Sequence, residues 1–165
     1  MAAAQHHIGG FRNLITVERP RSAEIQAFAA FWEKKRAAHR APPRSAIDPA
    51  EIVDHLPHIL LLDVLDGGRD FRFRLVGTAV VRATGRDVTG RTFSDVYKIG
   101  SPAFTTMRSI HHRVVAECHP IFVRCDVFWL PQDDPREFEG GFFPLSRDGE
   151  TVDMQICRVE YDWPR

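Results

Sequence analysis

The chain lacks most of the features that mark secreted or membrane-bound proteins. Its three cysteines, Cys118, Cys125 and Cys157, are widely spaced and form no Cys-x-x-Cys pair, which predicts reduced thiols instead of a disulfide framework. No apolar run approaches the roughly 18 residues that a membrane-spanning helix needs. The first residues lack the charged and apolar parts of a signal peptide, so we expect a cytoplasmic protein with no membrane span.

The sequence also lacks an excess of either charge. Lysine plus arginine and aspartate plus glutamate are balanced at 22 each, whereas nucleic-acid-binding domains usually have a basic excess or a clustered basic face. The densest basic run, at residues 34–36, lies near the end of an expected helix, where cations interact favourably with the helix dipole. We therefore expect no nucleic-acid partner.

Helical patterns dominate the first third of the chain. Residues 1–21 show no sustained period and are predicted to be a frayed segment. Ser22 can cap a helix that runs to about residue 39, and Asp48, followed by proline and glutamate, is typical of the start of a second, short helix. Residues 22–57 are thus predicted to be an N-terminal helical extension.

The first of these helices has three large apolar side chains at helical spacing, Ile25, Phe28 and Trp32. A helix of this kind must cover an apolar surface. The surface could be the sheet of its own chain or that of a second subunit in a homodimer, and the sequence leaves both arrangements open.

The domain predicted for residues 58–162 begins with a β-hairpin. Residues 59–66 start with consecutive apolar positions, which is typical of a strand covered on both faces in the middle of a sheet. A Gly-Gly turn at 67–68 then leads into residues 70–76, where apolar and polar residues alternate as in an edge strand.

Helical and extended segments follow in a simple order. Short helical pieces are expected between residues 77 and 100, then a longer helix from Ser101 to about Cys118. Three more strands are predicted at about 120–130, 137–145 and 150–160. This order predicts an α+β fold, a five-stranded antiparallel sheet with a helical cluster on one face and an extra N-terminal helix.

Several short motifs resemble the PAS family. Residues 75–79 (Leu-Val-Gly-Thr-Ala) and 89–91 (Thr-Gly-Arg) are similar to the PAS passage from the second strand into the helices. Residues 143–149 (Phe-Pro-Leu-Ser-Arg-Asp-Gly) are similar to the hairpin between the last two PAS strands. The resemblance implies the strand order 2-1-5-4-3, in which the first and fifth strands are neighbours.

The upstream residues extend the resemblance. With residues 44–49 and 56–58 included, the chain resembles a bacterial group of stand-alone PAS proteins over about residues 30–162. The resemblance implies a sensory or regulatory module in signal transduction. If the chain ends at residue 165, its output passes through a signalling protein partner or through its oligomeric state.

One histidine, His111, interrupts the apolar face of the long helix. In some PAS domains a histidine on the corresponding helix binds haem iron, so the resemblance makes haem an alternative at His111. We favour a histidine at the edge of the core that bonds a backbone carbonyl. No metal site is expected, because His55, His58 and the pair Cys118-His119 lack paired ligand spacings.

A ligand pocket is predicted between the sheet and the helix at 102–118. The positions expected to line it are Phe73, Leu75, Phe104, Met107, His111, Phe122 and Ile156. Walls of this kind suit a small apolar ligand. If these side chains instead fill the space, the chain is a ligand-free protein-interaction scaffold.

The sequence gives little support for catalysis, which needs a nucleophile, a base and a group that orients them. Its clustered carboxylates lie in a polar loop or at alternating strand positions, where solvated side chains are the usual outcome. They are Asp126, Asp133, Asp134, Glu137 and Glu139. We expect no enzyme.

Overall fold

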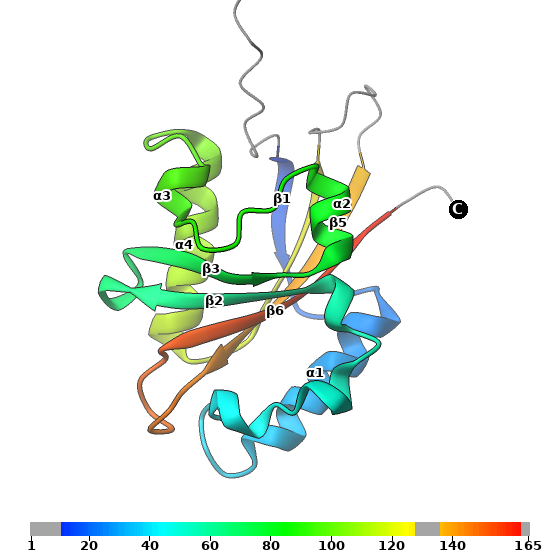
Figure 1. Cartoon of the computed structure of the whole chain (residues 1–165), viewed down its shortest axis with the longest axis vertical. Coiled ribbons are helices and arrows are strands. Elements are labelled where there is room, and N and C mark those ends of the chain that lie inside the picture. Colours follow the sequence, from blue (N-terminus) through cyan, green and yellow to red (C-terminus); the bar gives the residue numbers. More distant parts are fainter. Residues whose placement is uncertain (1–10, 128–135, 163–165) are drawn as a thin grey trace, which may run out of the picture.

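A six-stranded antiparallel sheet forms the middle layer of the protein (Figure 1). The computed structural model describes residues 11–127 and 136–162. The strands, in their spatial order, are β1 (Phe11–Val17), β4 (Ile121–Val127), β5 (Arg136–Leu145), β6 (Met154–Tyr161), β2 (Ile59–Leu65) and β3 (Asp70–Val76).

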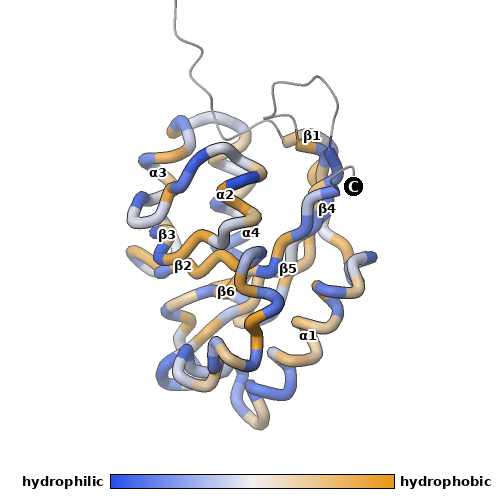
Figure 2. The backbone as a smooth tube through the Cα atoms, turned by 45° about the vertical axis from the view of Figure 1, so that its right-hand side comes forward, coloured by the Kyte–Doolittle hydropathy of each residue, from blue (hydrophilic) through white to orange (hydrophobic). Residues whose placement is uncertain are grey.

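Helices cover both faces of this sheet. The inner face, as we call it, packs against α2 (Thr78–Thr84), α3 (Phe93–Val96) and α4 (Pro102–Glu117). The outer face packs against α1 (Ala23–Arg36) and the short 3₁₀ turns η1 (Arg44–Ala46), η2 (Pro49–Ile52) and η3 (Leu56–His58). A further 3₁₀ turn, η4 (Asp66–Gly68), joins β2 to β3. Hydrophobic residues gather along the strands, and α1 alternates between hydrophobic and hydrophilic positions (Figure 2).

The predicted fold class is confirmed. The five predicted strands are β2 to β6, and they lie in the predicted order, with β2 paired to β6 and the half-polar β3 at the edge. The helix starts are also as predicted, since the side chains of Ser22, Asp48 and Ser101 each accept a bond from a backbone N–H of the first turn.

The sixth strand corrects one expectation. Residues 11–17 belong to the segment predicted to be frayed, yet they form β1 and pair with β4; residues 1–10 lie outside the described part. The register of β1 shifts between Arg12 and Ile15, and Asn13 adopts a left-handed conformation with φ 55°. Such a bulge interrupts the two-residue alternation by which a strand is found in a sequence.

Helix α1 covers the sheet of its own chain. Ile25 and Phe28 are fully buried and Trp32 is 2% exposed. The Phe28 ring meets Phe143 of β5 edge-on at 5.2 Å between centroids, and the Trp32 indole N–H donates to the Pro144 carbonyl at 2.9 Å. Of the two arrangements that the sequence left open, the structure has the one within a single chain.

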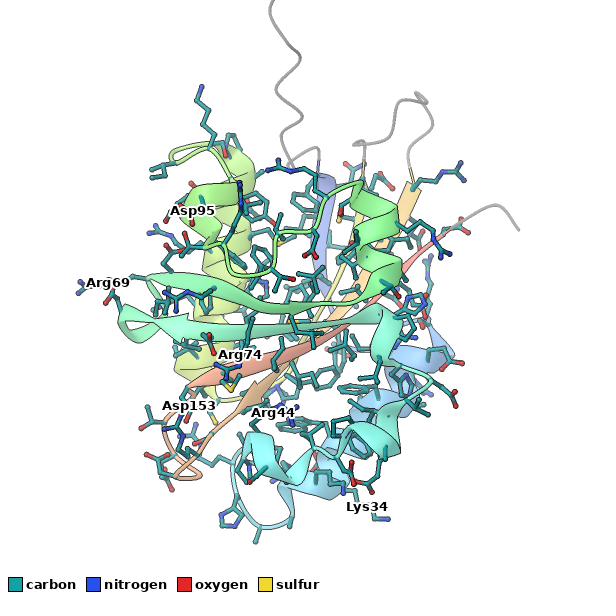
Figure 3. All side chains as sticks on the ribbon, viewed as in Figure 1. Lys34, Arg44, Arg69, Arg74, Asp95 and Asp153 are labelled. Atoms are coloured by element: carbon teal, nitrogen blue, oxygen red, sulfur yellow. The ribbon has the colours of Figure 1, made fainter. Side chains whose placement is uncertain are left out.

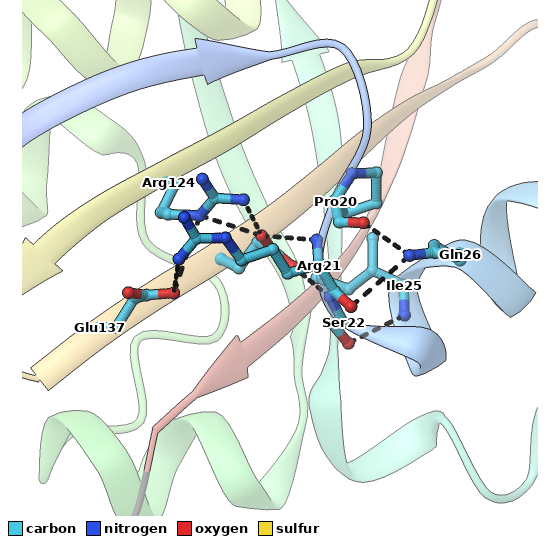
Figure 4. A network of polar contacts seen from close by, with 8 residues as sticks. Pro20, Arg21, Ser22, Ile25, Gln26, Arg124 and Glu137 are labelled. Carbon is cyan, nitrogen blue, oxygen red and sulfur yellow. Dashed lines mark hydrogen bonds and ion pairs between the residues drawn. The ribbon is translucent and has the colours of Figure 1, made fainter.

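A buried carboxylate, that of Glu139, anchors the start of this helix. Figure 4 shows Arg124 of β4 beside Arg21 and Ser22, where the chain enters α1. Glu139 of β5 is 5% exposed and accepts bonds from the backbone N–H groups of Arg21, at 3.0 Å, and Ser22, at 2.7 Å. Arg124 of β4 donates to the same carboxylate at 2.9 Å. Burial raises the pKa of Glu139, but these three donors lower it more, so that the pKa lies below its ordinary value.

We expect Trp32→Ala to lower the free energy of unfolding by about 3–5 kcal/mol, because it removes a buried ring and leaves the Pro144 carbonyl without its donor. Denaturant titration measures the change. The matched control is Ile99→Ala, at a side chain 70% exposed, which should change stability by less than about 0.5 kcal/mol. An unchanged midpoint for Trp32→Ala would contradict the packing of α1 described above.

Glu139→Gln should lower stability by about 1.5–3 kcal/mol near neutral pH, because the amide loses the charge that strengthens these bonds. The pKa of Glu139 is depressed, so its contribution is complete above the ordinary value of 4.5 and is lost as pH falls through the lower folded pKa. Unfolding curves at several pH values should show the gap between wild type and variant closing only below about pH 4.5. Glu137→Gln, at a side chain 44% exposed, is the control and should show little gap at any pH.

Candidate functional site

A small cavity lies between the inner face of the sheet and the helices α2, α3 and α4. Its volume is about 60 Å³, and its walls are mostly aliphatic and aromatic side chains from both layers. Four side chains with polar groups also line it, Thr84, Tyr97, His111 and Tyr161. None of them is a carboxylate, so a ligand held here would be recognised mainly by shape and apolar contact.

His111 is held in one orientation by a glutamine on the last strand. Its Nδ1 lies 2.8 Å from Oε1 of Gln155, and the Gln155 side-chain N–H donates back to the His111 carbonyl at 2.9 Å. Gln155 is fully buried and His111 is 4% exposed. The imidazole also stacks on Phe142 at 4.3 Å between centroids. The ring is therefore fixed by two hydrogen bonds and an aromatic face.

This arrangement determines the protonation state of the imidazole. Burial lowers the pKa of His111 to about 4, and the bond to Gln155 opposes the shift only in part. The ring is neutral at physiological pH. Because an amide oxygen can only accept, Nδ1 carries the proton and Nε2 carries the lone pair. The cavity wall thus contains one neutral imidazole of fixed tautomer together with the hydroxyl groups of Thr84, Tyr97 and Tyr161.

The structure brings three of the seven predicted pocket residues into the cavity wall: Phe73, Met107 and His111. Phe104 is buried in the same core but does not line the cavity. Its ring lies under the Arg108 guanidinium at 5.3 Å, near the start of α4.

The other three, Leu75, Phe122 and Ile156, lie on the outer face. Phe122 and Ile156 belong to the core under α1. Alternation alone does not place Ile156, because the first six residues of β6 are buried on both faces. In β4 the alternation is regular, and Phe122 shares its face with the polar Arg124 and Asp126. Leu75 is displaced by a bulge, since Leu61 pairs with Leu75 but Leu62 pairs with Phe73. A bulge of one residue moves the following side chain to the opposite face.

Gln155 and Tyr97 are site residues that the sequence reasoning missed. Gln155 is the one polar residue in the run Met154-Gln155-Ile156-Cys157. A single amide in such a run indicates a buried polar contact, and this is the pattern that could have identified it. Tyr97 follows α3, and burial raises the pKa of its hydroxyl.

The cavity does not fit the haem alternative. Pockets for drug-sized ligands occupy roughly 300–1,000 Å³, whereas this cavity measures about 60 Å³. A tetrapyrrole would require the helices to separate from the sheet. His111 also lies within a closed set of rings, including Phe71 at 5.5 Å and Phe93 at 5.2 Å between centroids.

The cysteines and the candidate carboxylates of the described residues do not line the cavity. No three His, Cys, Asp or Glu side chains of that part of the chain are grouped as metal ligands. The three cysteines are free and buried, and burial raises the pKa of each thiol. Among the candidate carboxylates, Asp126 accepts a bond from Asn13, while Asp133 and Asp134 lie outside the described residues. No helix that is described has the length and apolar character to cross a membrane.

An antiparallel sheet with short helices and one long helix over a central cavity is the architecture of a small sensory-type α+β domain. A family model described as PAS domain matches residues 20–154. The chain belongs to the PAS domain family.

Comparisons with individual proteins say less about the chain than the family match does. No curated protein matches the chain significantly. Among solved structures, an RNA-binding light-oxygen-voltage receptor is similar, with a TM-score of 0.46 and 18% identity. The match covers 72% of this chain and 35% of the receptor chain. This chain therefore spans about a third of that receptor, and similarity at this level carries no argument about what it binds.

We expect the His111 ring to resist protonation. Its folded pKa of about 4 lies below the ordinary value of 6.5, so the unfolded chain takes up the proton first. Stability from the neutral ring is complete above pH 6.5 and is lost as pH falls toward about 4. Ring ¹⁵N shifts should stay constant from pH 8 to about pH 5.5 and report a proton on Nδ1.

The Gln155→Leu variant should mix the two tautomers and lower the pKa further, because it removes the acceptor. His112, which bonds the Gly68 carbonyl outside the cavity, serves as an internal reference in the same spectra. A His111 titration centred near 6.5 would contradict the buried geometry.

Proposed function

We propose that the chain is a sensory or regulatory PAS module whose cavity binds a small, largely apolar ligand that donates one hydrogen bond to Nε2 of His111. The observation that carries the proposal is the neutral imidazole of fixed tautomer in a wall that is otherwise aliphatic and aromatic, apart from three hydroxyl groups. A neutral imidazole nitrogen with a lone pair accepts a bond from an N–H or O–H donor of the ligand.

The size of the cavity limits the ligand. An engineered apolar cavity of about 150 Å³ is enough for benzene, so about 60 Å³ accepts only a few heavy atoms unless the walls move. The short helices α2 and α3, together with α4, form the wall opposite the sheet. A larger ligand would have to displace them, and that displacement is the change that the module would pass on.

Nothing in this proposal requires chemistry on the ligand. The described cavity wall combines one imidazole with hydroxyl groups and contains no carboxylate, amine or thiol. The imidazole is oriented by an amide and not by a carboxylate, so the wall lacks the acidic group that orients a general base in a catalytic set. We therefore propose a binding module and not an enzyme.

The small volume also favours a second candidate, a ligand-free interaction scaffold. Most side chains that point into the core are almost fully buried, as in an ordinary close-packed protein core. In a scaffold of this kind the cavity would be a packing defect, and function would lie on the surface.

Native mass spectrometry of freshly purified protein distinguishes the two candidates. The ligand hypothesis predicts a bound mass that is lost on denaturation. Occupancy should fall in His111→Leu, which removes the acceptor, and in Val80→Phe, which fills the cavity from α2. His112→Leu is the matched control and should keep the ligand. Thermal melts check that each variant is folded.

A ligand-free wild type in repeated preparations, together with unchanged melting in the presence of small phenols and indoles, would support the scaffold instead. A bound mass that persists in both His111→Leu and Val80→Phe would place the ligand elsewhere and contradict the proposed site.

A further inference from the structure

On the outer face of the sheet, α1 packs mainly against β5 and β6. Beyond its reach, β2 and β3 form the floor of an open groove of about 920 Å³. The segment at residues 43–45 forms one wall, and the β5–β6 hairpin, with Arg147 and Asp153, forms the other. Arg44, Arg74 and Asp153 mark its position in Figure 3.

The bulge in β3 supplies this groove with an apolar side chain. Regular alternation after Phe73 would point Leu75 into the inner core. The register shift instead leaves Leu75 on the outer face, 41% exposed and beside the buried Leu61. Val64 and Met154 complete the apolar floor. A bulge that turns a leucine outward weakens the core, and such bulges commonly re-aim a side chain for a function.

Positive charge surrounds this floor. Arg74 pairs with Asp63 at 3.2 Å, and Arg147 lies 3.8 Å from Asp153. Arg44 donates to the Ile47 carbonyl at 2.8 Å, and within the described residues the structure gives it no carboxylate partner. The groove therefore has three guanidinium groups against two carboxylates, a net charge of +1, with the unmatched charge on Arg44.

The shape of the groove selects the kind of occupant. Small-molecule sites enclose most of their ligand, and this groove is open along its length. An apolar centre with a charged rim rich in arginine is the usual composition of a protein–protein interface. A second copy of the same face would set one concave surface against another and leave the centre unfilled.

We propose that this groove docks an extended or helical segment of a partner protein, which places an apolar side chain on Leu75 and a neighbouring carboxylate on Arg44. The site is independent of the inner cavity, so it stands whether or not a small ligand is bound there. It would be the surface through which the module contacts its signalling partner.

A random peptide library displayed on phage tests the groove directly. Selection on wild-type protein, after depletion on the Leu75→Glu variant, should enrich peptides that combine an acidic residue with a nearby leucine, isoleucine or phenylalanine. Fluorescence polarisation with the selected peptides should show binding weakened at least about tenfold by Leu75→Glu and by Arg44→Glu. Both positions are at least partly exposed, so the variants should fold, and thermal melts check this.

Two exposed residues outside the groove provide matched controls. Ile99→Glu introduces the same charge at a side chain 70% exposed, and Arg69→Glu reverses a charge at the far end of the β2–β3 hairpin (Figure 3). Binding should be unchanged in both. The proposal is overturned if no selected peptide depends on Leu75, if the enriched peptides are basic, or if the controls weaken binding equally. A concentration-dependent dimer that Leu75→Glu dissociates would also overturn it, because the occupant would then be a second copy.

Discussion

The structure depends on one constraint: the central strands are apolar on both faces, so both faces must be covered. Residues 138–145 of β5 are buried without interruption, as are residues 154–159 of β6. Helices α2, α3 and α4 cover the inner face, which leaves α1 and the 3₁₀ turns to cover the outer face. Helix α1 approaches the sheet closely at Gly141 of β5, where an added Cβ atom would lie 3.0 Å from the Ile25 side chain and 2.8 Å from the Phe143 ring. A side chain at that position would push α1 away from the sheet. Two residues earlier in the same strand, the buried Glu139 carboxylate fixes the start of the helix through its bonds to the Arg21 and Ser22 N–H groups.

Strand β6 connects the two cores that result. Gln155 points inward and bonds His111, whereas its neighbours Met154 and Ile156 point outward into the core under α1. The same strand begins at the edge of the outer groove, which Met154 lines. A ligand that altered the His111–Gln155 pair would therefore act on the strand that also supports α1 and the groove. The inner cavity and the outer face are separated by the thickness of one sheet.

The sequence was sufficient for the fold but only for part of the site. Helix starts, strand positions and the two-sided cover of β2 follow from apolar runs, caps and turns, which are local patterns. The strand order followed from the resemblance to the PAS family. The errors occurred where a single backbone irregularity decides the outcome. Bulges in β1 and β3 break the alternation, so the first strand was missed and Leu75 was assigned to the wrong face. For Ile156 the reason differs, because β6 is buried on both faces and such a strand contains no pattern that tells inner from outer. Phe122 could have been assigned from the sequence, since it shares a face of β4 with the polar Arg124 and Asp126. The position of Gln155 opposite His111 depends on the register between α4 and β6, which the sequence does not encode locally.

The buried His111–Gln155 pair bears on the choice between a ligand-binding module and a scaffold. A scaffold needs only a filled core, and an apolar pair of similar volume would serve it better, because each buried polar group must recover its desolvation through hydrogen bonds. For Gln155, two hydrogen bonds to His111 offset the free-energy cost of removing its amide from water. The Nδ1 of the imidazole is committed to Gln155, so Nε2 is the ring nitrogen that a ligand would meet. The presence of a polar pair where an apolar pair of similar volume would pack well therefore supports the ligand hypothesis. On that hypothesis the His111→Leu variant would lose the ligand and keep the core.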